Sequence, residues 1–283
     1  MPTAEEIRRA VQAALAEDIG NGDVTTLATV PASATAKAVM KAREALVVAG
    51  LALAEAAFRE LAPAMQVKQI AADGEAVKDG EILMEIAGPA RAILSAERVA
   101  LNFLQRLSGV ATLTAQFVEA VNDTHAQIRD TRKTTPGWRN FEKYAVKSGG
   151  GHNLRHGLHD MILIKDNHLA ALRNEQPNAV AAAVQRARAK YPKLEVEVEA
   201  DTLEQVEQAA AAGADIILLD NMNLVQLRLA VQNVKGRAQT EASGGVNLAS
   251  VRAIAETGVD FISVGALTHS ARAVDIGLDF EES

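Results

Sequence analysis

One segment of the chain concentrates positive charge although the protein as a whole is acidic. The formal net charge is −7 at pH 7, yet the segment from Arg129 to His168 holds eight Lys or Arg residues against four acidic ones. Four of the cations follow strand-like apolar runs or a glycine turn: Arg132, Lys133, Arg155 and Lys165. A guanidinium binds two oxygens of a carboxylate or phosphate at once. The pattern therefore predicts a site for a small anionic ligand, although a solvated basic loop would show the same concentration of charge.

Carboxylates follow in the next strand-like runs. The run LEVEVEAD (194–201) places Glu195, Glu197 and Glu199 on one face of a strand and the valines on the other, and Asp220 ends the apolar run IILLD. In a barrel the apolar face must meet the helices, so the glutamates would point inward toward cations, a metal or ligand hydroxyls. Glu199 and Asp220 could then hold Mg²⁺ or sugar hydroxyls. An edge strand with one solvated face would show the same alternation.

Glycine-rich turns end the last two strand-like runs. ASGGV (242–246) and SVGAL (263–267) each lie at a strand end before a turn or helix. Glycine lets backbone N–H groups approach an anion, and phosphate sites of barrels commonly lie at the last two strand ends. These turns predict a phosphate site, although glycine at such a turn also serves plain turn geometry.

Two other kinds of chemistry are less well supported. Lys165 at a strand end would also suit a Schiff-base aldolase, but its cationic neighbours and Asp166 fit a permanently charged lysine equally well. The histidines of the basic segment do not have a helical metal-ligand spacing, and the chain has no cysteine. Disulfides, zinc–thiolate sites and thiol catalysis are therefore excluded.

The elements that position these residues alternate between strand and helix. Six strand-like runs begin near residues 126, 161, 194, 214, 239 and 261, and helical patterns separate most of them. This alternation predicts a parallel sheet. An open doubly wound sheet would satisfy the pattern. We favour an incomplete α/β barrel of six or seven strands, because the ends of the runs carry the chemistry and barrels place their active sites at the carboxyl ends of the strands.

A separate N-terminal domain precedes the barrel. Thr3 and Glu6 form a capping-box signal for a helix to about Asp18, and short strand patterns separated by DG and GP turns follow. A long helical pattern from Ser95 links the two halves. We expect an α/β sandwich over residues 1–112, a barrel over 113–269, and a tail (270–283) that packs back on the first domain.

Composition limits the class of protein. The chain has 283 residues, 48% of them hydrophobic, enough for a large core. Its N-terminal residues lack the apolar core of a signal peptide, and no apolar run approaches the length of a membrane span. We expect a cytoplasmic protein that binds neither membranes nor, given its acidity, nucleic acid.

Several motifs in fixed order resemble one enzyme family. They are EDIGNGDVTT, SAERVALNFLQRLSG, DTRKTTPGWRNFEKYAV, the GGG, N, R, GL and D positions of GGGHNLRHGLHD (149–160), LIKDNH, VEVE, LLDN, SGG and VGALTHS, which together span nearly the whole chain. The chain resembles the quinolinate phosphoribosyltransferases. The resemblance implies an N-terminal α/β sandwich, an incomplete barrel and a homodimer, or a larger homo-oligomer, with shared active sites. It also implies conversion of quinolinate and phosphoribosyl pyrophosphate to nicotinate mononucleotide, pyrophosphate and CO₂ with Mg²⁺, in NAD biosynthesis.

The resemblance also implies roles for residues at the matching positions. Quinolinate would be bound by Arg98 (reaching in from the partner subunit), Arg132, Lys133, Arg155 and Lys165. Phosphoribosyl pyrophosphate would be bound by Glu199, Asp220, Ser243, Gly244, Gly245, Gly265 and His269. The catalytic residues would be Lys165, Glu199 and Asp220, the last two also holding Mg²⁺ directly or indirectly. One departure is Leu154, where many family members have a histidine and where an apolar side chain cannot bind a carboxylate.

Three alternatives stay open at the level of sequence. Relatives associated with molybdenum uptake share the fold and motifs. Nicotinate phosphoribosyltransferase takes a mono-acid and should need fewer cations than this chain has. A non-catalytic anion-binding protein would keep the site without turnover, although the presence of both Glu199 and Asp220 argues against this.

Overall fold

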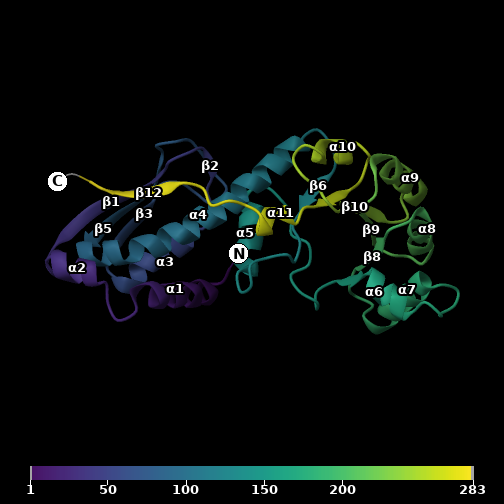
Figure 1. Cartoon of the computed structure of the whole chain (residues 1–283), viewed down its shortest axis with the longest axis horizontal. Helices are drawn as coiled ribbons and strands as arrows, with labels where there is room; N and C mark the ends of the chain where they lie inside the picture. Colours follow the sequence, from purple (N-terminus) through teal and green to yellow (C-terminus); the bar gives the residue numbers. More distant parts are fainter. Residues whose placement is uncertain (1, 282–283) are drawn as a thin grey trace. The chain divides into compact units, whose positions relative to one another are not determined.

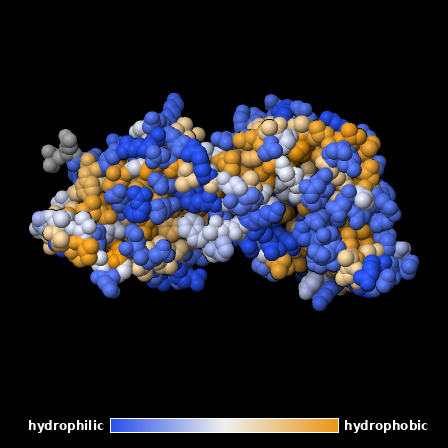
Figure 2. Space-filling model, in the orientation of Figure 1, coloured by the Kyte–Doolittle hydropathy of each residue, from blue (hydrophilic) through white to orange (hydrophobic). Residues whose placement is uncertain are grey.

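The computed structural model describes residues 2–281 as two compact units (Figure 1). Within that range the first unit comprises residues 2–115, 135–150 and 270–281, and the second comprises residues 116–134 and 151–269. The chain therefore enters each unit more than once. No helix within residues 2–281 has the length and apolar character needed to cross a membrane. On the face drawn in Figure 2, hydrophobic residues are interspersed with hydrophilic ones over both units.

The first unit contains an antiparallel sheet with helices. Its strands are β1 (Thr35–Ala42), β3 (Gln66–Gln69), β5 (Ile82–Pro89) and β12 (Ile276–Phe280), in the order β12-β1-β5-β3, and β2 (Leu46–Val47) pairs separately with β4 (Ala76–Val77). Its helices are α1 (Ala4–Ile19), α2 (Val24–Thr29), α3 (Leu51–Leu61) and α5 (Arg139–Ser148), with most of α4 (Ala90–Ala120). The predicted capping box of α1 is present: the Glu6 amide donates to Thr3 Oγ1 at 3.2 Å. Because β12 pairs with β1, the C-terminal tail is a strand of this sheet.

Residues 135–150 belong to the first unit, whereas the sequence boundaries assigned them to the barrel. Trp138 stacks on Phe103 of α4 with ring centroids 5.0 Å apart, and the Tyr144 hydroxyl donates to Asp73 at 2.6 Å. These contacts join α5 to residues far earlier in the chain, which the continuous sequence pattern could not show.

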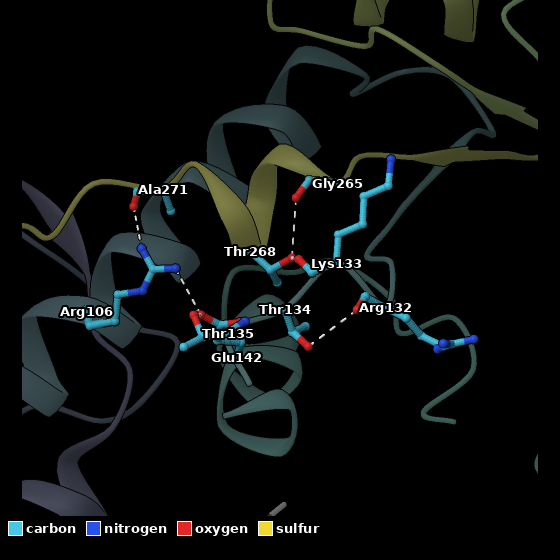
Figure 3. Close-up of polar contacts among 9 residues, drawn as sticks. All are labelled: Arg106, Arg132, Lys133, Thr134, Thr135, Glu142, Gly265, Thr268 and Ala271. Carbon is cyan, nitrogen blue, oxygen red and sulfur yellow. Dashed lines mark hydrogen bonds and ion pairs between the residues drawn. The ribbon is translucent and has the colours of Figure 1, made fainter. Parts of the chain in front are cut away.

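An ion pair with a buried carboxylate adds to this attachment of α5. Glu142 is fully buried and accepts a hydrogen bond from Arg106 of α4 at 2.9 Å and two from Thr135, at 2.9 Å from its amide and 2.8 Å from its hydroxyl (Figure 3). Arg106 also donates to the Ala271 carbonyl oxygen. Arg106 and Glu142 thus fix two stretches of chain, beginning at Thr135 and Ala271, within the first unit.

The second unit contains a six-stranded sheet in which every neighbouring pair is parallel. Its strands are β6 (Gln127–Arg129), β7 (Ile162–Ile164), β8 (Val196–Ala200), β9 (Ile216–Asp220), β10 (Gln239–Ser243) and β11 (Phe261–Ser263). Its helices are α6 (Asp166–Ala171), α7 (Ala179–Lys190), α8 (Leu203–Ala211), α9 (Leu224–Val234), α10 (Val251–Ala255) and α11 (Ala266–His269). From β7 to α11 strand and helix alternate as the sequence predicted, with two helices, α6 and α7, between β7 and β8, whereas the helix between β6 and β7 is α5 of the first unit.

Strand order decides between a barrel and an open sheet. The order is β6-β11-β10-β9-β8-β7. The first strand of the unit therefore pairs with the last, and from β7 to β11 each strand pairs with the next one in the sequence. Pairing of first with last is how a barrel closes, whereas the two common doubly wound orders do not show it. Among the described residues, β6 and β7 belong to one sheet but do not pair, so the barrel is incomplete and has six strands.

Candidate active site

The carboxyl ends of the six parallel strands carry nearly all of the predicted site residues. Arg132 and Lys133 follow β6, Lys165 follows β7, and Glu199 and Asp220 lie at the ends of β8 and β9. Ser243, Gly244 and Gly245 lie at the end of β10, and Gly265 and His269 follow β11. Because parallel strands end at the same edge of the sheet, these groups face one another around the barrel mouth.

Arg155 reaches this edge through a contact that the sequence did not suggest. His152 forms an isolated parallel bridge with Arg129 of β6: its amide donates to the Ile128 carbonyl at 2.8 Å, and the Asp130 amide donates to the His152 carbonyl at 3.1 Å. Arg155, three residues on, is thereby brought toward Arg132. Burial, and then repulsion by Arg132, lower the pKa of Arg155, while Glu197 and Asp160 oppose this shift. Two guanidinium groups close enough to repel each other form a natural site for a doubly charged acid.

Leu154 occupies an apolar position. Its side chain packs against the buried cluster of Met161, Ile216 and Phe261, and its amide donates to Asp130 at 2.9 Å. The chain therefore uses the side chain at this position for packing.

The carboxylates lie on neighbouring strands. Glu199 of β8 is paired in register with Leu218 of β9, two residues before Asp220. Burial, and then the negative charges of Glu199 and Asp201, raise the pKa of Asp220, while Lys165 and a hydrogen bond from Asn221 lower it. Glu199 also forms an ion pair with Lys165. The acidic and basic halves of the site therefore meet at β7 and β8.

Asn221 is a site-shaping residue that sequence reasoning missed. It has a positive φ of 52°, its side-chain amide donates to Asp220 at 2.7 Å, and its backbone amide donates to the Ser243 carbonyl at 2.9 Å. Gly244 has a positive φ of 98°, and a Cβ there would lie 2.1 Å from Asn221 Oδ1 and 3.0 Å from its backbone nitrogen, so a side chain at this position would be strained. The signal was available, because asparagine tolerates the left-handed region better than most residues and follows a strand in LLDN.

A second polar layer lies inside the barrel. Arg129 of β6 forms an ion pair with Glu241 of β10 at 3.0 Å, and the Ser263 hydroxyl donates to the same buried carboxylate. The Arg129 guanidinium also lies 3.0 Å from the centre of the Phe261 ring. The sequence analysis assigned no role to Glu241 or Ser263.

The three glutamates of the LEVEVEAD run differ in environment. Glu195 is exposed and precedes β8, so the expectation that it points inward was wrong. Glu197 is fully buried, and neither carboxyl oxygen has a hydrogen-bond partner in the described part of the chain. Burial, and then the charge of Glu241, raise the pKa of Glu197 well above its usual range, against the attraction of Arg129, Arg155 and Lys165. Of the three, only Glu199 lies at the carboxyl end of the strand beside Asp220.

Arg98 is the one predicted site residue on the other unit. It lies on α4, in the part of that helix belonging to the first unit. The structure therefore does not bring Arg98 into the second unit, which carries the other predicted site residues.

Comparison with known proteins identifies the family. The N-terminal domain model of quinolinate phosphoribosyl transferase matches residues 23–108, and the C-terminal domain model matches residues 110–279. The chain is 45% identical over 278 residues to a nicotinate-nucleotide pyrophosphorylase [carboxylating] of Mycobacterium leprae, covering 96% of each chain. It is 43% identical over 264 residues to a probable enzyme of the same name from Bacillus subtilis, covering 93% of this chain and 89% of the relative.

A solved structure of the same family has the same fold as this chain. The nicotinate-nucleotide pyrophosphorylase from Francisella tularensis superposes with a TM-score of 0.93 at 38% identity, covering 99% of this chain and 98% of the other. Both domain models, the full-length relatives and the fold agree, and the chain belongs to the quinolinate phosphoribosyltransferase family.

Proposed function

We propose that this protein transfers the phosphoribosyl group of phosphoribosyl pyrophosphate to quinolinate and removes one carboxylate, giving nicotinate mononucleotide, pyrophosphate and CO₂. Beyond family membership, one observation carries the proposal. At the barrel mouth, cations follow β6 and β7 while carboxylates end the adjoining β8 and β9. A diacid needs cations to bind its carboxylates, and the ribose of phosphoribosyl pyrophosphate needs carboxylates to accept hydrogen bonds from its hydroxyls.

The cations would bind and orient the diacid. Arg132 and Arg155 are suited to one carboxylate each, and Lys133 and Lys165 add positive charge on either side. Holding both carboxylates fixes the ring nitrogen in position to attack the anomeric carbon, which lowers the entropic part of the barrier. A mono-acid would leave part of this positive charge uncompensated.

The carboxylates would act on the ribose. As pyrophosphate leaves, the anomeric carbon takes on positive charge, and Glu199 and Asp220 can stabilise that charge electrostatically. Attack by the ring nitrogen then makes the nitrogen cationic. Loss of CO₂ from the adjacent carbon leaves an electron pair beside the positive nitrogen, and that carbon finally takes a proton.

Mg²⁺ fits this site as a partner of the substrate rather than as a metal held by the protein alone. Within residues 2–281 no group of three or more His, Cys, Asp or Glu residues could hold a metal ion, but Glu199 and Asp220 supply two carboxylates on adjacent strands. These residues would hold the ion together with oxygens of phosphoribosyl pyrophosphate. When bound, Mg²⁺ would neutralise charge on the departing pyrophosphate.

A homodimer with shared active sites is the second part of the proposal. Arg98 lies on the unit that carries none of the other site residues, which is consistent with a role at the barrel mouth of a partner subunit.

The phosphate of the ribose would be bound at the last two strand ends, by Ser243, Gly244, Gly245, Gly265 and His269. A cytoplasmic location and any assembly larger than a dimer stay predictions.

One assay tests the reaction. The purified protein is incubated with quinolinate, phosphoribosyl pyrophosphate and Mg²⁺, and nicotinate mononucleotide and CO₂ are measured. We expect both products in equal amounts. Substrate binding without product would indicate an anion-binding protein, and faster product formation from nicotinate would indicate a nicotinate phosphoribosyltransferase. Absence of both binding and turnover would favour a different substrate, as in relatives of the molybdenum-uptake type.

A further inference from the structure

A buried hydroxyl links the turns after the first and last strands of the barrel. β6 and β11 are adjacent parallel strands, with Arg129 paired to Ser263, and the Val264 amide donates to the Arg129 carbonyl at 2.9 Å. Beyond this pairing the two segments leave the sheet, one continuing into Arg132 and Lys133 and the other into Gly265 and α11. After this last hydrogen bond between the strands, other contacts must hold the turn after β6 against the turn after β11.

Thr268 of α11 makes such a contact. Its side chain is fully buried, and its hydroxyl donates to the Lys133 carbonyl oxygen at 2.7 Å (Figure 3). The Gly265 carbonyl oxygen lies 3.3 Å from the same hydroxyl. Since a hydroxyl has one proton, the shorter contact is the principal hydrogen bond. The bond joins residues 135 apart in the sequence. It links the backbone of the turn that carries Arg132 and Lys133, proposed to bind the diacid, to α11, which follows Gly265.

The packing around this bond is close. A Cβ on Gly265 would lie 3.2 Å from Cδ of Lys133 and 3.1 Å from Nε2 of His269. Gly265 therefore packs closely against the side chains of both Lys133 and His269. A shift of the Lys133 backbone would move a cation of the diacid half relative to both groups proposed to take the phosphate.

We propose that Thr268 is a positioning residue that sets the spacing between the two substrate-binding halves. The inference rests on the proposed function, in which Thr268 is assigned contact with neither substrate. Its hydroxyl holds the Lys133 carbonyl, and through it the turn that carries Arg132 and Lys133, against α11. Valine at this position would keep the shape of the side chain and remove the donor to a carbonyl in a buried setting.

The test compares Thr268→Val with Thr268→Ser and with a matched control. Serine keeps the donor. The control is Thr114→Val: Thr114 is also fully buried, but its hydroxyl donates to a carbonyl of its own helix, that of Val110 one turn back on α4, at 2.7 Å. Steady-state constants for quinolinate and for phosphoribosyl pyrophosphate are measured per folded molecule, together with the midpoint of urea unfolding.

We expect Thr268→Val to lower kcat by on the order of 10- to 100-fold, as for a misplacement of about 1 Å, with smaller changes in both KM values. Serine should restore most of the activity, and Thr114→Val should change only the unfolding midpoint. The inference is overturned if Thr268→Val turns over like the wild type, or if serine is as impaired as valine.

A readout that needs no substrate separates this inference from the proposed function. Amide hydrogen exchange is followed in peptides covering residues 130–135. Thr268→Val should exchange faster there, and Thr114→Val should match the wild type. If the wild type is inactive with quinolinate but the exchange changes as expected, the proposed function fails while the positioning role stands. Unchanged exchange would show that Thr268 does not hold this turn.

Discussion

Lys165 and Glu199 form an ion pair between the ends of the adjacent parallel strands β7 and β8. The lysine side chain is about half exposed at 46%, whereas that of Glu199 is 10% exposed. The pair joins a cation proposed to bind quinolinate to a carboxylate proposed to act on the ribose. A change at either residue therefore alters the electrostatic surroundings of the other.

Substitution at this pair should separate binding from turnover. Glu199→Gln removes the charge proposed to stabilise the cationic sugar and should lower kcat by roughly 10²- to 10³-fold, comparable to the loss of one oxyanion-hole donor. It also removes a competitor for Lys165, so quinolinate should bind at least as tightly as in the wild type. Lys165→Ala should weaken quinolinate binding by about 1.5–3 kcal/mol, the usual contribution of a hydrogen bond to a charged group.

Calorimetric titration with quinolinate alone measures both binding predictions. Glu195→Gln is the matched control, because Glu195 is an exposed neighbour in the same acidic run. Loss of quinolinate binding in Glu199→Gln, with normal binding in Lys165→Ala, would reverse the roles assigned here.

The two guanidinium groups of Arg132 and Arg155 should make the enzyme prefer a diacid substrate. We expect a higher kcat/KM for quinolinate than for nicotinate, and a loss of at least about 2–3 kcal/mol of transition-state stabilisation in Arg132→Ala or Arg155→Ala. Lys147→Ala, which removes an exposed cation of α5, should have little effect. Equal specificity constants for the two acids would contradict the assignment.

Subunit exchange tests whether Arg98 acts in trans. At a quinolinate concentration well below the KM of either variant, the Arg98→Ala and Lys165→Ala proteins should each have little activity alone. A hybrid dimer would have one site with both residues intact, so mixing the two variants should restore activity. Exchange is verified by mass spectrometry of differently labelled subunits. Proven exchange without restored activity would refute the trans assignment.

Acid should remove the contribution of Glu44 to stability. Hydrogen bonds from Arg272, and then from the Asp275 amide at 2.8 Å, lower the pKa of Glu44 to about 2. Since the folded pKa lies below the ordinary value of 4.5, the stabilisation is present above pH 4.5 and is lost as the pH falls toward 2. The difference in unfolding free energy between the wild type and Glu44→Gln should therefore shrink over this range. Urea unfolding at a series of pH values measures it, and a constant difference would contradict the assignment.

Gly109 should not tolerate a side chain. Alanine normally stabilises a helix by about 1 kcal/mol relative to glycine. At Gly109 of α4, however, a Cβ would lie 1.9 Å from the Arg272 carbonyl oxygen. We expect Gly109→Ala to lower the free energy of unfolding by about 1–3 kcal/mol, as overpacking does. Asn102→Ala, at an exposed position of the same helix, is the control and should be close to neutral. A stabilised Gly109→Ala protein would show that the contact is not rigid.

Features encoded in neighbouring residues could be predicted from the sequence. The Thr3–Glu6 capping box lies within four residues, and the six strand runs of the barrel could be located because the pattern of apolar residues is local. The polar residues that end those runs placed Arg132, Lys165, Glu199 and Asp220 at one edge, since parallel strands of one sheet end together. The family motifs added the reaction, because they occur in a fixed order along nearly the whole chain.

The tertiary structure alone decided what depends on residues far apart in the chain. The pairing of β6 with β11 distinguishes a barrel from an open sheet, and the contacts of α5 with α4 place residues 135–150 in the first unit. The hydrogen bond from Thr268 to Lys133 joins residues 135 apart. Local periodicity records which face of an element is buried, but it carries no information about which distant element covers that face. These pairings follow from packing the whole chain, so only the folded structure shows them.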